Sequence, residues 1–179
     1  MNDIFQKGIE VNIPEVLNNR DKRVAIQEKL VNANPTKTII GAKLNIPGPI
    51  KNNTEIEYFF EQEMAFFEQK LNEKFSFQLF LSKLSQPTGP ESFYIIDGSS
   101  QAVKKLCIDF EESKDYRRLF DLDVHNFGQN DLSRTDLGFP ERQCLVCGKP
   151  AKECGRARTH TVADLQAKVS KLILEAISK

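Results

Sequence analysis

The spacing of apolar residues between Thr38 and Val124 restricts the fold more than any other feature of the chain. An alternation of apolar and polar residues is typical of strands, whereas apolar residues three and four apart are typical of amphipathic helices. This pattern predicts strands over 38–46, 75–84, 92–96 and 118–124. It predicts one helix between the first two strands, with apolar positions at Ile56, Phe59, Phe60, Met64, Phe67 and Leu71. A further helix carries Ala102, Val103, Leu106 and Phe110 on one face.

The predicted order is therefore strand, helix, strand, strand, helix, strand, which is the split βαβ arrangement of ferredoxin-like α+β folds. The turn at 126–130 predicts an extra hairpin strand around 131–136. A C-terminal helix is predicted from about Val162 to Ile177. We expect a single domain over 1–179, in which residues 139–179 form an appended part, a Cys/His loop and the last helix.

An N-terminal helix is predicted over 12–31, with apolar positions at Val16, Leu17, Val24 and Leu30. The run Arg20 to Arg23 interrupts that stripe and is interpreted as a charged turn that faces solvent. Three helix starts carry a capping-box pattern, in which a polar cap residue is followed three positions later by an acid. These pairs are Asn12 with Glu15, Thr54 with Glu57, and Thr161 with Asp164.

Composition and charge exclude several classes of protein. The 179 residues carry no net charge and have a sequence pI of about 6.7, so general affinity for nucleic acid or anionic membranes is not expected. The first ten residues lack the charged and apolar regions of a signal peptide, and no apolar run approaches the ~18 residues that span a bilayer. Three of the four cysteines lie close together, unlike a secreted disulfide framework. We expect a cytoplasmic protein.

Three cysteines and a histidine follow the spacing Cys-x2-Cys-x6-Cys-x5-His, with Cys144, Cys147, Cys154 and His160 as the members. Thiolates and a neutral imidazole are ligands that zinc prefers, and such a set closes a tetrahedral site. The six-residue gap matches no standard zinc finger, so a set of reduced thiols packed under a loop is the alternative. A redox Cys-x-x-Cys pair is disfavoured because no βαβ unit precedes it in the manner of thioredoxin.

Asp121 and Asp123 are two apart on a predicted strand, so both carboxylates should lie on the same face. Such a pair can hold Mg²⁺ against phosphate oxygens, although an exposed strand face explains it equally simply. Arg118 and Arg134 lie nearby in the sequence, and arginine forks match phosphate oxygens. His125 is a candidate general base, with a structural histidine as the alternative.

Two Gly/Pro turns carry one charged residue each. They are Pro47 to Lys51 and Thr88 to Glu91. Both are ordinary turns by default. At the mouth of a site, Lys51 could offer a point charge to phosphate and Glu91 another hard ligand. Neither a P-loop nor a dinucleotide-binding glycine pattern occurs in the chain.

Several short blocks occur in the order that is typical of one enzyme family. The blocks are Pro14-Glu15, Arg20-Asp21 with Arg23, Pro47-Gly48-Pro49-Ile50-Lys51, Gly89-Pro90-Glu91, Arg118 to Val124, Ser133-Arg134 with Asp136, Pro140, Arg142, Cys144-Leu145 with Cys147, Ala151, Cys154, Arg156 and His160. On these residues the sequence resembles the citrate lyase holo-acyl-carrier-protein synthases, the apo-citrate lyase phosphoribosyl-dephospho-CoA transferases. The resemblance extends over nearly the whole chain.

The resemblance implies a nucleotidyltransferase-type enzyme that attaches the prosthetic group of citrate lyase to its apo acyl carrier subunit. The donor would be triphosphoribosyl-dephospho-CoA, the acceptor a serine hydroxyl and the leaving group pyrophosphate. Our hypothesis is that Asp121 and Asp123 hold Mg²⁺. The general base is left open between His125 and an aspartate. The candidates for binding the triphosphate are Arg118, Arg134 and Arg142, followed by Arg156 and Arg158.

Two other classes of function remain as alternatives. A zinc-stabilised binding module without catalytic activity would present a basic face with exposed aromatic residues, whereas this chain is neutral and its phenylalanines follow predicted core stripes. A thiol redox protein would require a lowered pKa at Cys144 or Cys147. Both are weaker readings than the transferase.

Overall fold

One antiparallel sheet organises the structure, a computed structural model that describes residues 3–178. Its central strands are β1 (Thr38–Leu44) and β3 (Glu91–Asp97), and its edge strands are β2 (Ser76–Lys83) and β4 (Phe120–Asn126). The strands lie in the order β2-β3-β1-β4. The predicted α+β class is confirmed, and the sheet places segments far apart in sequence next to one another.

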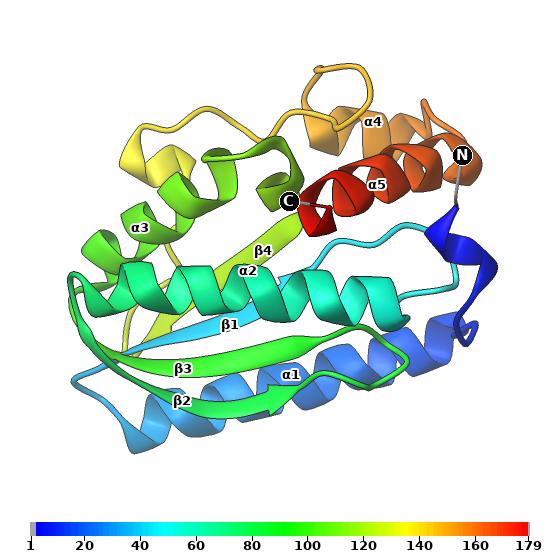
Figure 1. The fold of residues 1–179 in the computed structure, drawn as a ribbon. Helices are drawn as coiled ribbons and strands as arrows, with labels where there is room; N and C mark the ends of the chain where they lie inside the picture. Colours follow the sequence, from blue (N-terminus) through cyan, green and yellow to red (C-terminus); the bar gives the residue numbers. More distant parts are fainter. Residues whose placement is uncertain (1–2, 179) are drawn as a thin grey trace.

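Helices cover both faces of the sheet (Figure 1). α2 (Thr54–Asn72), α3 (Ser100–Glu112) and α5 (Val162–Ile177) pack on one face around a common core. α1 (Ile13–Ala33) packs on the other face, over a smaller cluster. The remaining helical segments are short: η1 (Ile4–Gln6), η2 (Asp115–Leu119), η3 (Thr135–Leu137) and α4 (Ala151–Ala157).

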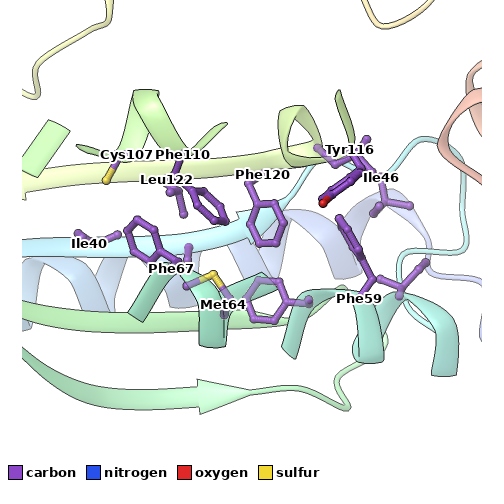
Figure 2. Close-up of a cluster of buried hydrophobic side chains, with 14 of the residues drawn as sticks. Ile40, Ile46, Phe59, Met64, Phe67, Cys107, Phe110, Tyr116, Phe120 and Leu122 are labelled. Carbon is purple, nitrogen blue, oxygen red and sulfur yellow. The ribbon is translucent and has the colours of Figure 1, made fainter. Parts of the chain in front are cut away.

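The main core is built from the predicted apolar stripe of α2, all six members of which are buried. Figure 2 shows its aromatic centre, where Phe59 lies 5.5 Å from Phe120 and Phe67 lies 5.0 Å from Phe110 between ring centroids. Burying one such side chain contributes about 1.5–3 kcal/mol. Because Phe120 begins β4, this packing fixes the start of the strand that carries Asp121.

α1 is attached to the sheet through polar side chains as well as through its smaller apolar cluster. Arg23 pairs with the buried Glu91 at 2.8 Å, and Asn19 donates to the same carboxylate oxygen at 2.7 Å. Gln27 lies over Gly41, where a Cβ atom would come within 2.3 Å of its amide nitrogen. The prediction that the turn containing Arg23 faces solvent is therefore wrong for this residue. Two of the predicted apolar positions are exposed instead, namely Leu17 and Val24.

The helix starts largely follow the predicted capping residues. Capping boxes are present at the starts of α1 and α5, formed by Asn12 with Glu15 and by Thr161 with Asp164. At α2 the predicted box is wrong, because Asn53 and not Thr54 is the cap and accepts the N–H of Ile56. Ser99 caps α3 by accepting the N–H of Ala102.

The predicted hairpin strand around 131–136 is wrong, since within residues 3–178 no strand follows β4. Asp136 accepts hydrogen bonds from both the backbone N–H and the hydroxyl of Ser133, and the Ser133 hydroxyl accepts the N–H of Asp136. Such local side-chain bonds give the backbone an alternative to a strand ladder. The segment forms η3 and ends at Gly138, which has a φ of 79°.

The C-terminal region joins the main core through α5. Val169, Leu172 and Ile173 are buried there beside the residues of α2. The N-terminal 3-10 helix is held to α5 as well, because Ser170 accepts the N–H of Ile4 at 3.1 Å. Among the helices of the described residues, none is long and apolar enough to cross a membrane.

Candidate functional site

A cleft of about 830 Å³ lies between the end of α3, η2, the segment that carries the cysteine cluster and the start of α5. Its charged lining includes Glu111, Arg118, Arg134, Arg142 and Arg158. Its apolar lining includes Pro140, Leu145, Ala151, Val162 and Leu165. Four of the five arginines predicted to bind phosphate thus face one cavity, although they come from distant parts of the sequence.

Arg142 is the central cation of the cleft. Its Nη2 atom lies 2.7 Å from Oε2 of Glu111 and 3.3 Å from Oδ1 of Asp121, and its Nη1 atom donates to the carbonyl of Phe120 at 3.0 Å. Its side chain is 32% exposed, so the guanidinium is held in place and still reaches the cavity.

Arg134 shares the Glu111 carboxylate with Arg142. Its Nη2 atom lies 3.2 Å from Oε2 of Glu111, and its Nη1 atom lies 2.8 Å from Oε1 of Glu112. The Ser133–Asp136 turn described above sets the position of this arginine. Arg118 completes the set by donating to the carbonyl of Gln143 at 2.9 Å.

Asp121 joins the cleft to the face of the sheet that α1 covers. Lys43, opposite it on β1, donates to its Oδ2 atom, while Arg142 contacts its Oδ1 atom. Burial alone would raise the pKa of Asp121, but Lys43, and after it Arg142 and Lys104, outweigh burial and hold the pKa below its usual value. This carboxylate is therefore ionised and fully paired at neutral pH.

Asp123 lies on the same face as Asp121, opposite Gly41 on β1. No hydrogen bond or ion pair joins its carboxylate to any of residues 3–178. Glu91 lies on the far side of Lys43 on β3, and its Oε2 atom is buried without a partner among these residues. The two predicted acids thus share a face but have very different surroundings.

The other predicted site residues lie outside the cleft lining. His125 contacts Asp131 through Nδ1 at 2.8 Å, near the far end of β4. Lys51 donates to the carbonyl of Ile46 at 2.6 Å, and burial lowers the pKa of this amine. Arg156 is exposed on α4. Asp123 and Glu91 do not line the cleft either.

The four residues of the Cys/His cluster come together in space. The ligand atoms of Cys144, Cys147, Cys154 and His160 all lie within 4.8 Å of one another. Among residues 3–178, this is the only group of three or more His, Cys, Asp or Glu side chains placed so that it could hold a metal ion. A tight turn at Gly148, with a φ of 71°, brings the first two sulfurs together. α4, which the sequence pattern did not predict, supplies Cys154. We call residues 144–160 the knuckle.

The chemistry of the knuckle fits a soft metal ion. The backbone N–H of Lys149, followed by hydrogen bonds with His160 and Cys154, lowers the pKa of Cys147 to about 6. The hydrogen bond with Cys147 raises the pKa of Cys154 to about 11. The sulfurs of these two cysteines are 3.4 Å apart, close to the ~3.8 Å edge that Zn–S bonds of about 2.3 Å give a tetrahedral site. Nε2 of His160 is buried without a partner in the described residues.

Sequence reasoning missed Glu111 and Lys43, the two residues that hold the cleft charges in place. Glu111 follows the apolar stripe of α3 and is 3% exposed, so its partners come from two other segments. Nothing in the sequence distinguishes Lys43 from other strand lysines, and only the register of β1 with β4 places it beside Asp121. No spacing within the sequence marks either residue.

Comparison with known proteins finds one family model and several relatives that match this chain over nearly its whole length. The sequence model of the family described as apo-citrate lyase phosphoribosyl-dephospho-CoA transferase matches residues 11–176. Protein CitXG of Leuconostoc mesenteroides subsp. cremoris is 37% identical over 175 residues, which cover 96% of this chain and 37% of that protein. The chain therefore spans little more than a third of the length of CitXG.

Other relatives match over most of their own length. A probable apo-citrate lyase phosphoribosyl-dephospho-CoA transferase of Streptococcus pyogenes serotype M18 is 34% identical over 181 residues, covering 99% of this chain and 93% of that protein. The apo-citrate lyase phosphoribosyl-dephospho-CoA transferase of Citrobacter koseri is 30% identical over 168 residues, covering 94% and 91%. The chain belongs to the apo-citrate lyase phosphoribosyl-dephospho-CoA transferase family.

Proposed function

We propose that the chain transfers the phosphoribosyl-dephospho-CoA group from triphosphoribosyl-dephospho-CoA to a serine of the apo acyl carrier subunit of citrate lyase. Family membership supports this reaction. The observation that carries it is the single cleft lined by Arg118, Arg134, Arg142 and Arg158, because a triphosphate needs several fixed cations.

The reaction is of the nucleotidyltransferase type. The serine oxygen forms a bond to the α-phosphate of the donor, the bond from that phosphorus to pyrophosphate breaks, and the serine proton passes to a base. Negative charge accumulates on the phosphate and on the departing pyrophosphate. Arginine forks fixed before substrate arrives stabilise such charge. His125 or an aspartate is the base in this proposal.

The arginines divide into two groups. Arg134 and Arg142 line the cleft beside Glu111 of α3, Arg118 of η2 lies in the same lining, and these three are the proposed triphosphate ligands. Arg158, at the C-terminal end of α4, approaches the same cleft from the knuckle. Arg156 is exposed outside the lining and has a secondary role in the proposal.

The Mg²⁺ proposal rests first on Asp123. Carboxylate oxygens are the donors that Mg²⁺ prefers, and Asp123 offers one without a partner in the described part of the chain. Both oxygens of Asp121 are already engaged, by Lys43 and Arg142, so this residue fits as a metal ligand only if one of them is released. Glu91 is proposed as a further acidic metal ligand, and Lys51 is proposed as an amine that binds phosphate.

We propose zinc for the knuckle, held by Cys144, Cys147, Cys154 and His160. Three sulfurs and an imidazole form a closed ligand set, which is typical of a structural site and leaves no position for substrate. The lowered pKa of Cys147 would also suit a redox pair, but such a pair has no need of a third sulfur and a histidine.

We also propose that the core is of the ferredoxin-like type and that residues 1–179 act as one transferase domain. The element order and the sheet order β2-β3-β1-β4 support the first proposal. The packing of α5 in the main core supports the second. A cytoplasmic location stays a prediction from the sequence.

The proposed function is tested by mixing the protein with apo acyl carrier subunit, triphosphoribosyl-dephospho-CoA and Mg²⁺, and then measuring the mass of the carrier. We expect the carrier to gain the mass of one phosphoribosyl-dephospho-CoA group. Asp123→Asn should lose at least tenfold in rate with its fold intact, whereas the matched change Asp109→Asn on the exposed side of α3 should have no effect. No mass gain, with zinc bound, would instead favour a binding module.

A further inference from the structure

Glu111 is the buried member of three glutamates that line the cleft beside its four arginines, the exposed ones being Glu112 and Glu141. Glu111, in the last turn of α3, is 3% exposed. The helix is packed against β4 by its apolar stripe, so the position of this carboxylate is fixed by the main core. A buried charge of this kind is costly unless it is paired and hydrogen-bonded.

Each oxygen of this carboxylate has a separate task. Oε1 accepts the backbone N–H of Leu122 at 2.9 Å, which anchors Glu111 to the outer edge of β4. Oε2 contacts Nη2 of Arg142 at 2.7 Å and Nη2 of Arg134 at 3.2 Å. Two guanidinium groups are thereby brought to one oxygen atom, although their like charges repel each other.

The contacts leave donors available to a ligand. A guanidinium has five N–H donors. The recorded bonds of Arg134 and Arg142 involve only their Nη atoms, and Nε of each makes none with the described residues. Because both arginines line the cavity, these unused donors are available to a ligand there, while Glu111 engages one Nη atom of each guanidinium.

We propose that Glu111 is a positioning residue for the triphosphate of the donor: it holds Arg134 and Arg142 side by side so that both forks meet the phosphates together. This inference rests on the proposed function. Without the carboxylate the two cations would separate, and a ligand would have to bring them back together at the cost of affinity. Glu111 acts through the arginines and does not itself touch the phosphates.

A second buried ion pair provides a structural control. Arg117 contacts Glu63 at 2.6 Å with side-chain exposures of 7% and 13%, and its guanidinium lies 4.1 Å from the ring centroid of Phe66. Neither residue lines the cleft. Glu63→Gln therefore breaks a buried glutamate–arginine pair of similar kind and should lower stability without changing the phosphate site.

The test is calorimetric binding of inorganic triphosphate to the wild-type protein and to Glu111→Gln, Arg142→Ala, the double variant and Glu63→Gln. Glu111→Gln keeps the size of the side chain but loses its charge, and we expect its affinity to fall about tenfold, or about 1.4 kcal/mol. Arg142→Ala should weaken binding by a similar factor. The double variant should bind no worse than Arg142→Ala within about twofold, because residues that act together give non-additive effects. Glu63→Gln should bind like the wild type.

Equal or tighter triphosphate binding by Glu111→Gln, or additive losses in the double variant, would overturn the inference and leave the transferase proposal intact. Absence of triphosphate binding by the wild type would overturn both the inference and the placement of the donor in the cleft. The transferase activity is judged separately, by the mass of the carrier. If Glu111→Gln fails to fold, Glu111→Asp replaces it: the shorter carboxylate cannot reach both arginines and Leu122, so the same tenfold loss is expected.

Discussion

The two walls of the cleft hold their charged and reactive side chains by different means. On one wall, which we call the packed wall, Glu111 of α3 and Asp121 of β4 are backed by the main core and the strand ladder, and they hold Arg142 of the loop that precedes the knuckle. On the other wall, the knuckle exposes Cys147, leaves Val146 43% exposed and relies on short backbone bonds within the loop. The packed wall is fixed by tertiary packing, whereas the knuckle depends on bonds within its own loop and on the zinc ion that we propose for its four ligand residues.

Because of this difference, we expect variants of the two walls to affect different properties of the protein. A change of a charged residue on the packed wall alters the charge of the cleft and leaves the apolar residues of the main core in place. A change in the knuckle removes the interactions that hold the loop itself, since only Cys144 and Cys154 of its four ligand residues are buried. We therefore expect the first kind of variant to lose activity and the second to lose bound metal and order.

The largest effect is expected on the packed wall. Arg142→Ala should lower the rate of transfer by roughly 10²- to 10³-fold, because it removes a fixed charge from the phosphate site. Carrier mass measured over time gives the rate. Arg156→Ala, on the exposed side of α4, should change the rate by no more than about threefold. Similar losses in the two variants would show that the packed wall has no special role.

The second prediction concerns the knuckle. Cys154→Ser should abolish stoichiometric zinc and lower Tm by about 4–8 °C, since metal binding and local folding are coupled and about 2 kcal/mol corresponds to such a shift in a domain of this size. Elemental analysis and thermal unfolding measure both effects. Cys107→Ala removes a cysteine that is fully buried in the main core, and this variant should keep its zinc. A wild-type protein purified without any metal would contradict the prediction.

The smallest effect is a pH dependence at Asp121. Lys43 and Arg142 hold the pKa of Asp121 in the folded state below its ordinary value of 3.8, so its contribution to stability is present above that pH and is lost as the pH falls through the folded value. Asp121→Asn should lower the free energy of unfolding by about 1–2 kcal/mol at pH 6. The gap between wild type and variant should narrow below pH 3.8. Urea unfolding at both pH values measures it, and a gap that does not change with pH would refute the ion-pair role.

The features that were predictable from sequence depend on short-range signals. The stripe of α2 and the capping boxes at α1 and α5 involve residues three or four apart, and all of them are present. α4 was missed because its seven residues, with Gly155 among them, give no helical period. The hairpin strand was predicted wrongly because Ser133 and Asp136 bond locally.

The sequence indicated which residue types form the candidate site, but it did not show which carboxylate pairs with which arginine. Arg118 and Arg134 were selected because they lie near two acids in the sequence, Arg142 was selected with the family resemblance, and the structure brings all three to one cleft. Their partner Glu111 could not be found this way, because it lies 23 residues before Arg134 and only the fold brings them together. Arg23 was assigned to solvent for the same reason, since its partner Glu91 is 68 residues away.

The bond between Glu111 and the backbone of β4 has a consequence for solubility. β4 is an edge strand, and such edges expose donors and acceptors that can pair with a strand from another molecule. At Leu122 both groups are occupied by α3, because Glu111 accepts the N–H and Lys104 donates to the carbonyl at 3.1 Å. An incoming strand would have to displace both side chains, so α3 protects this edge from sheet-to-sheet aggregation.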